Sequence, residues 1–191
     1  ILDRAGAAGV QAVVTIADDL DAARWAVQAA DWDPRGYAAV ALHPTRANAL
    51  DDAAKAELEE LAAQPRVVAV GETGMDMYWP GRLEGCADPA EQREGFAWHI
   101  DLAKRTGKPL MIHNRDADAE VLDVMRAEGA PETVIFHCFS SDAAMARICA
   151  AHGWMVSLSG TVSFRNARAL REAATVVPAE LLLVETDAPF L

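Results

Sequence analysis

The chain has 191 residues, of which 52% are hydrophobic and 24% are charged. This length and composition support one sizeable hydrophobic core and exclude a disordered chain. The formal net charge of −12 argues against a protein that holds nucleic acid through a broad basic surface. It does not exclude an enzyme that binds one phosphate group through metal ions, because the ions supply positive charge locally.

The three cysteines, Cys86, Cys138 and Cys149, form no CxxC pair. An odd number of cysteines without paired spacing is typical of a reducing compartment, so we expect a cytoplasmic protein. No apolar run is long enough to span a membrane and no secretory signal is visible. We therefore expect no membrane partner.

Strand-like and helix-like segments alternate along the chain. The near-continuous apolar run at residues 67–70 is typical of a strand that is buried on both faces of a parallel sheet. Seven strand-like runs cover residues 10–17, 37–44, 67–74, 109–114, 133–139, 154–160 and 181–187. The spacing between successive runs fits one strand followed by one helix.

Amphipathic segments with capping residues lie between the strand-like runs. The clearest begins with Asp88 as N-cap, Pro89 at the first helical position and Glu91 as the capping-box acid. We expect this helix to reach Thr106 and to end at Gly107. The other expected helices cover residues 19–31, 51–64, 117–128, 142–152 and 166–176.

This alternation allows two α/β architectures, a doubly wound sheet or a (β/α)8 barrel. A doubly wound sheet usually carries a glycine-rich phosphate loop, and the sequence contains none. A barrel has eight strands and typically about 250 residues, so this chain is short of it by one unit. In either case we expect a single domain over residues 1–191. The loop at residues 75–87, which contains Tyr78 and Trp79, is a candidate wall of an active site.

Five of the strand-like runs end in a histidine or an acid: His43, Glu72, His113, His137 and Asp187. A barrel gathers the C-terminal ends of its strands around one mouth, so these side chains should converge. Neutral imidazole and carboxylate groups are ligands for zinc, manganese and similar divalent ions. Three of only five histidines occupy strand ends, which favours a site for one or two metals over isolated rim residues. Such a site makes hydroxide available near neutral pH and polarises a carbonyl or phosphoryl oxygen.

Two arginines are candidate substrate-binding residues that could contact a phosphate. Arg115 follows His113 closely, and Arg165 lies at a strand-to-helix turn where an anion can bind. The alternative for Arg115 is a capping or surface role, and for Arg165 it is a solvated charge.

Other residues have structural interpretations. Cys138 should point to the opposite face of its strand from His137 and pack as a small hydrophobe. Asp76 lies close in sequence to Glu72 and is expected to support the site or to belong to the loop. The apolar helix patterns place Trp25, Trp32 and Trp98 in the core or in the helical shell.

Four ordered motifs resemble those of the TatD-like deoxyribonucleases, a family of the amidohydrolase superfamily. They are GETGMD at residues 71–76, PLMIHNR at 109–115, HCFS at 137–140 and ETDAPFL at 185–191. The segment ALHP at residues 41–44 resembles the third-strand motif of that family. The resemblance covers nearly the whole chain. It implies a (β/α)8 TIM barrel with a two-metal centre that cleaves DNA phosphodiester bonds, often as a 3′–5′ exonuclease.

The resemblance implies one role for each strand-end residue. Glu72 would be shared between two metals, and His113 and His137 would bind the second metal. Asp187 would bind the first metal and take the proton from the attacking water. His43 would contact the substrate, which is expected to be DNA that is single-stranded or cleaved at its ends. The expected cofactors are two divalent ions, Mg²⁺, Mn²⁺ or Zn²⁺.

The sequence departs from the family pattern at both ends. The first-strand His-x-His pair has no counterpart, and nothing corresponds to the segment after the Asp-Ala-Pro motif. We therefore expect a TIM barrel without its first strand and its C-terminal segment, in which seven strands are visible. Two alternatives stay open: a metal-dependent amide or ester hydrolase of the same superfamily, such as a D-aminoacyl-tRNA deacylase-like enzyme, and an inactive, incomplete barrel.

Overall fold

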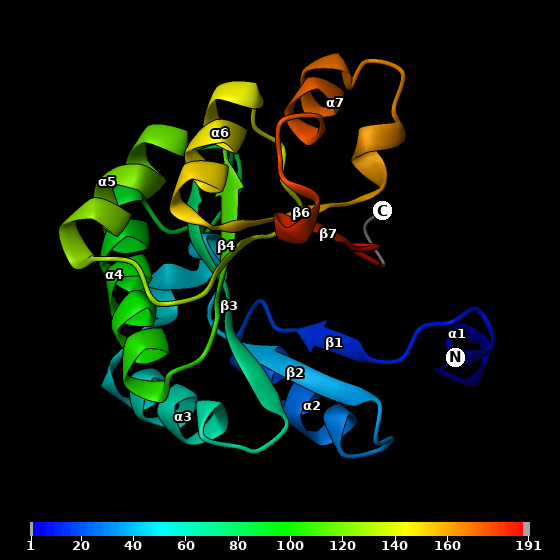
Figure 1. The fold of residues 1–191 in the computed structure, drawn as a ribbon. Helices are drawn as coiled ribbons and strands as arrows, with labels where there is room; N and C mark the ends of the chain where they lie inside the picture. The colour runs from blue at the N-terminus through cyan, green and yellow to red at the C-terminus, as the bar shows by residue number, and fades with distance from the viewer. Residues whose placement is uncertain (1, 189–191) are drawn as a thin grey trace.

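The computed structural model describes residues 2–188 and contains one parallel sheet of seven strands. The strand order is β1-β2-β3-β4-β5-β6-β7, so each strand pairs with the next one along the chain. The sheet curls into a half-barrel with helices on its outer side (Figure 1). The strands are β1 (Val13–Ile16), β2 (Gly36–Val40), β3 (Val67–Asp76), β4 (Leu110–Arg115), β5 (Val134–Phe136), β6 (Met155–Leu158) and β7 (Leu182–Val184). The predicted α/β barrel-type fold with seven visible strands is confirmed.

Seven α-helices and three short 3-10 helices connect the strands within the described residues. The α-helices are α1 (Leu2–Ala7), α2 (Leu20–Ala30), α3 (Asp52–Ala62), α4 (Pro89–Thr106), α5 (Asp118–Glu128), α6 (Ala143–His152) and α7 (Arg168–Ala174). The 3-10 helices η1 (Pro44–Ala49), η2 (Gly160–Ser163) and η3 (Ala179–Leu181) were not expected from the sequence. None of the helices among these residues is both long and apolar enough to cross a membrane.

The predicted ends of α4 are confirmed. The Asp88 side chain accepts hydrogen bonds from the backbone N–H groups of Ala90 and Glu91, and the Glu91 side chain accepts one from the N–H of Asp88. Gly107 ends the helix in the left-handed region, at a φ of +65°. Local capping chemistry therefore fixes the helix that covers the outside of β3 and β4.

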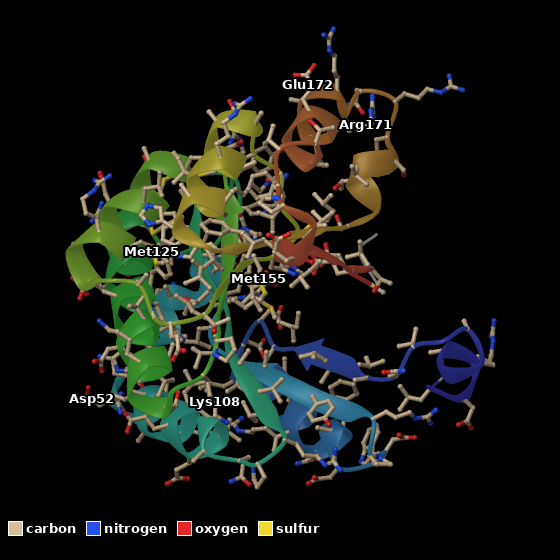
Figure 2. All side chains as sticks on the ribbon, viewed as in Figure 1. Asp52, Lys108, Met125, Met155, Arg171 and Glu172 are labelled. Carbon is tan, nitrogen blue, oxygen red and sulfur yellow. The ribbon has the colours of Figure 1, made fainter. Side chains whose placement is uncertain are left out.

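Side chains of the central strands alternate between the helical layer and the inner face of the sheet. On β4, Leu110 and Ile112 are fully buried and join a core that also contains Met125 of α5, which is labelled in Figure 2. His113 and Arg115 are half-buried on the other face of the same strand. The alternation along β4 thus directs His113 and Arg115 to the inside of the half-barrel.

The two outermost strands differ from the central ones. Within residues 2–188, β1 pairs only with β2, and β7 pairs only with β6. Burial on both faces, which the apolar runs predict, is therefore found for β3 but not for these two strands. Val184 of β7 is 83% exposed, and Val13 and Val14 of β1 are also exposed.

The prediction that three tryptophans lie in the core or the helical shell is confirmed for Trp98, which is partly buried against the core, and was wrong for Trp25 and Trp32. Their side chains are 53% and 70% exposed, and the two rings meet edge to face with their centroids 5.8 Å apart. Helix α2 turns Ala23, Ala26 and Ala30 toward the sheet. This leaves Trp25 on the solvent side, while Trp32 follows the end of the helix.

Two glycines allow β3 to approach β4 closely on either side of Glu72. A Cβ atom at Gly71 would overlap the side chain of Met111, and one at Gly74 would overlap the carbonyl oxygen of His113. Gly74 also has a φ of +141°, which side chains of L-residues rarely adopt. The pairing of β3 with β4 shifts register in this stretch, and the shift accompanies the placement of Glu72 at the site.

Candidate metal centre

The strand-end residues His43, Glu72, His113, His137 and Asp187 line one cavity of about 650 Å³. Glu72 lies within β3 and His113 within β4, whereas the other three residues lie just beyond the ends of β2, β5 and β7. All five strand ends point to the same side because the strands are parallel. The structure therefore brings together the five residues that the sequence singled out.

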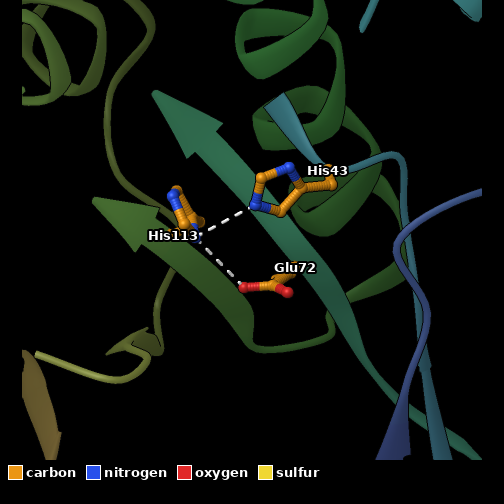
Figure 3. A group of neighbouring side chains, drawn as sticks. All are labelled: His43, Glu72 and His113. Atoms are coloured by element: carbon orange, nitrogen blue, oxygen red, sulfur yellow. Dashed lines mark hydrogen bonds and ion pairs between the residues drawn. The ribbon is translucent and has the colours of Figure 1, made fainter. Parts of the chain in front are cut away.

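His43, Glu72 and His113 form the tightest group of possible ligands (Figure 3). Each offers one donor atom, and these atoms lie within 4.8 Å of one another. Nδ1 of His113 is 3.2 Å from Nε2 of His43 and 3.4 Å from Oε2 of Glu72. His43, which the resemblance places at the substrate, therefore stands among the atoms that can hold an ion.

His137 and Asp187 extend this group on the other side of Glu72. Nε2 of His137 lies 3.5 Å from Oε2 of Glu72 and 3.3 Å from Oδ1 of Asp187. The Glu72 carboxylate thus stands between two histidines. Imidazole nitrogens and carboxylate oxygens that converge in this way fit a zinc- or manganese-type ion.

Each of these histidines also contacts a second carboxylate through its other nitrogen. Nε2 of His113 is 3.0 Å from Oδ2 of Asp76, which is fully buried, and Nδ1 of His137 is 2.5 Å from Oε2 of Glu185. An outer carboxylate of this kind fixes the ring orientation of a metal-binding histidine and the nitrogen that it presents. The supporting role expected for Asp76 agrees with this contact. Glu185 was missed as a site residue, although it begins the ETDAPFL motif.

The buried charges shift the pKa values of the group. Burial opposes the charged form of His113, but the hydrogen bonds and charges of Asp76 and Glu72 outweigh it and raise the pKa of His113 to about 9. Burial also opposes ionisation of Glu72, yet His113 brings the pKa of Glu72 down to about 2. Burial lowers the pKa of His43 to about 4, and the nearby His113 charge adds to this effect. The site therefore holds ionised Glu72 beside a protonated His113, and a cation bound by this ring would take the place of its proton.

Comparison with known proteins identifies the family and the fold. The model of the family described as TatD related DNase matches residues 1–191. The chain belongs to this family. The family resemblance inferred from the four motifs is thereby confirmed.

Relatives of this TatD-family chain support the assignment. A Mycobacterium tuberculosis protein described as an uncharacterized metal-dependent hydrolase TatD is 75% identical over 191 residues, which cover all of this chain and 72% of the relative. An Escherichia fergusonii protein described as a 3′-5′ ssDNA/RNA exonuclease TatD is 32% identical over 194 residues, covering 100% of this chain and 72% of the relative. The crystal structure of YJJV, a TatD homolog from Escherichia coli, superposes with a TM-score of 0.87 at 27% identity, covering 98% of this chain and 71% of that one. The chain is thus a metal-dependent hydrolase of the TatD family.

The two arginines predicted to bind substrate lie in different places in the TatD-family chain. Arg115 lines the cavity, two residues after His113 on the same face of β4. Arg165 is exposed in the segment after η2 and lies outside the residues that line the cavity; its carbonyl oxygen accepts a hydrogen bond of 3.4 Å from Nη2 of Arg171. A substrate contact for Arg165 stays a prediction.

Two further residues line the cavity against or beyond expectation. Cys138 faces the cavity, with its Sγ 3.1 Å from Oγ of Ser159, so the prediction that it points away from the site was wrong. The reason is that β5 ends at Phe136 and the chain turns at Cys138, where φ is +41°. Asp18, which follows β1 and also lines the cavity, was missed as a site residue. Like His43, it is a possible ligand that comes just after a strand, so the same sequence pattern could have identified it.

Proposed function

We propose that this TatD-family hydrolase cleaves phosphodiester bonds of DNA, with divalent ions held by Glu72, His113, His137 and Asp187. The main support is the position of Glu72, whose Oε2 lies 3.4 Å from His113 Nδ1 and 3.5 Å from His137 Nε2. Bound divalent ions supply Lewis-acid stabilisation for the attacking and leaving oxygens of a phosphoryl displacement. His43 belongs to the same group of donor atoms and would contact an ion or the substrate.

The charges of the cavity favour a phosphate-containing substrate once cations are present. The carboxylates of Asp18, Glu72 and Asp187 line it and repel a phosphodiester when no cation is bound. Arg46 and Arg115 line the same cavity. One guanidinium group can donate two parallel hydrogen bonds to the oxygens of a phosphate. Cations at the carboxylates and arginines on the wall together provide a place for the negatively charged backbone.

Asp187 is the proton acceptor in this proposal. Its Oδ1 lies 3.3 Å from Nε2 of His137, beside the group of ligand atoms. A carboxylate there is placed to accept a proton from a water that attacks the phosphorus. The Escherichia fergusonii relative, described as a 3′-5′ ssDNA/RNA exonuclease, supports single-stranded nucleic acid as the substrate class.

A substrate panel tests the proposal. The full-length natural protein is incubated with single-stranded DNA, an aminoacyl ester and an amide, each with added Mg²⁺, Mn²⁺ or Zn²⁺. We expect cleavage of the DNA that depends on the metal, that is lost in Glu72→Gln, and that is retained in the control Glu60→Gln, which changes an exposed acid on α3. Turnover of the ester or the amide without any cleavage of DNA would show that the site acts on a different bond.

A further inference from the structure

The loop between β3 and α4, residues 77–88, contributes an aromatic wall to the cavity. Trp79 lines the cavity together with Glu72 and His113, and Leu83 of the same loop lines it while 43% exposed. Tyr78 lies directly beside Trp79, and the two rings meet edge to face with centroids 4.9 Å apart. The metal chemistry proposed above uses none of these side chains.

Arginine side chains stand against these rings. The guanidinium carbon of Arg115 lies 4.0 Å from the centroid of Tyr78 and 5.4 Å from that of Trp79, and the corresponding atom of Arg82 lies 4.5 Å from Tyr78. Within the part of the chain that the structure describes, Arg115 forms no ion pair with a carboxylate. Aromatic rings position the guanidinium group of Arg115, and no carboxylate among the described residues neutralises its charge. Its N–H groups therefore stay available to an anion.

The aromatic wall is fixed relative to the candidate metal ligands. Oδ1 of Asp76 accepts hydrogen bonds from the backbone N–H groups of Tyr78, at 2.8 Å, and Trp79, at 2.9 Å. Oδ2 of the same carboxylate contacts Nε2 of His113. Gln92 of α4 accepts a hydrogen bond of 2.7 Å from the N–H of Asp76 and so holds this residue from the other side. One buried carboxylate therefore sets the position of the loop and of a histidine at the metal centre together.

We infer that Trp79 and Arg115 form a nucleotide subsite next to the metal centre, in which a nucleobase stacks on Trp79 while Arg115 binds the adjoining phosphate. This inference rests on the proposed function and names how the substrate is held. Aromatic side chains bind bases of single-stranded nucleic acid by stacking, and the interaction tolerates any sequence because every base has a flat face. The subsite therefore recognises single-stranded DNA without preference for a particular base.

The test compares Trp79→Ala with Trp32→Ala in the full-length natural protein. Trp32 is 70% exposed and lies outside the residues that line the cavity, so it controls for the loss of a tryptophan. The substrates are a single-stranded oligonucleotide and the same oligonucleotide with an abasic residue at its cleaved end. We expect Trp79→Ala to raise the KM for the intact oligonucleotide about tenfold or more and to leave the KM for the abasic one unchanged. Trp79→Phe should keep most of the affinity, and Trp32→Ala should change neither value.

A second variant and a binding measurement separate the two proposals. Arg115→Gln should raise the KM for both oligonucleotides, because both keep the phosphate. Thymidine 5′-monophosphate, added together with Mg²⁺, should quench tryptophan fluorescence in the wild type and in Trp32→Ala but not in Trp79→Phe. DNA cleavage with an unchanged KM in Trp79→Ala would overturn the subsite and leave the proposed function standing. If the protein does not cleave DNA, the proposed function is wrong. Quenching that is lost in Trp79→Phe would then still support the subsite, and quenching that is equal in all three proteins would overturn it.

Discussion

Oδ2 of Asp76 lies 3.0 Å from Nε2 of His113, which joins a fully buried carboxylate to a candidate metal ligand. Because a carboxylate only accepts hydrogen bonds, Nε2 of His113 carries the proton in this contact. The other ring nitrogen, Nδ1, then faces Glu72 at 3.4 Å. The orientation of this imidazole is thus decided by a side chain outside the group of ligands.

Replacement of Asp76 should weaken metal binding. Asp76→Asn removes the charged acceptor and offers His113 an amide in its place, so the affinity for Zn²⁺ or Mn²⁺ should fall about 10- to 100-fold. Isothermal titration calorimetry on the full-length natural protein measures this change. Asp52→Asn is the matched control, because Asp52 is an exposed carboxylate at the start of α3 (Figure 2). If Asp76→Asn and Asp52→Asn bound the metal ion with equal affinity, Asp76 would have no supporting role in metal binding.

Glu185 should act in the same way on His137 and should also contribute to stability. Its Oε2 lies 2.5 Å from Nδ1 of His137, and its Oε1 accepts a hydrogen bond of 2.5 Å from the N–H of Cys138. Glu185→Gln keeps the shape but loses the charge, so we expect weaker metal binding and a decrease of about 1–3 kcal/mol in the free energy of unfolding. Calorimetry and urea denaturation of the metal-free protein measure the two effects separately. Unchanged values in both experiments would contradict the expectation.

Asp187→Asn should remove most of the activity and leave the fold intact. The backbone of Asp187 lies in the left-handed region, with a φ of +55°, and asparagine tolerates this region well. Loss of the proton acceptor should lower kcat about 100- to 10,000-fold, with an unchanged circular dichroism spectrum. Asp116→Asn is the control, because Asp116 has a φ of +53° but is exposed and does not line the cavity. Wild-type turnover by Asp187→Asn would exclude it as the base.

Stability should fall in mild acid because of His99, which is buried in α4. Nε2 of His99 accepts a hydrogen bond of 3.2 Å from the N–H of Leu42, and Nδ1 donates one of 2.7 Å to the carbonyl of Gly95. Burial lowers its pKa from 6.5 to about 4, so the folded state prefers the neutral ring. The contribution of His99 to the free energy of unfolding is fully present above its unfolded pKa of 6.5. It is lost as the pH falls toward 4, because only the unfolded chain then takes up the proton.

His99 should lower the free energy of unfolding by about 3 kcal/mol between pH 6.5 and pH 4. Urea denaturation of the wild type at intervals from pH 7 to pH 4.5 measures it. His99→Gln has no titrating side chain and should show a shallower decrease over the same range. His152→Gln, which changes an exposed histidine at the end of α6, should follow the wild type. If His99→Gln and the wild type lose stability in parallel, His99 is not the group responsible.

Local signals predicted much of the fold. The capping residues Asp88 and Glu91 and the stop at Gly107 determine α4 through contacts within a few residues, and such contacts are legible in a sequence. The strand ends were predicted for a different reason: parallel strands place His113 and His137 on the same side whatever the details of packing. The 3-10 helices were not predicted because they are short and lack a repeating apolar pattern.

Contacts between distant segments account for what was missed. Glu185 lies 48 positions after His137, and the pairing of β5 with β6 and of β6 with β7 brings the two side chains together. The exposed position of Trp25 depends on which face of α2 meets the sheet, and an alanine-rich helix gives little indication of that face, whereas Trp32 lies beyond the end of α2.

The strand order also determines how the ligands respond to local opening of the protein. Glu72 and His113 lie on β3 and β4, and His137 follows β5, so these three ligands belong to adjacent strands in the middle of the sheet. Asp187, in contrast, follows β7, which joins these strands through β6. Segments that pack together open together in native-state fluctuations. A fluctuation within β3, β4 and β5 would therefore displace the three ligands together, whereas the position of Asp187 depends on two further strand pairings.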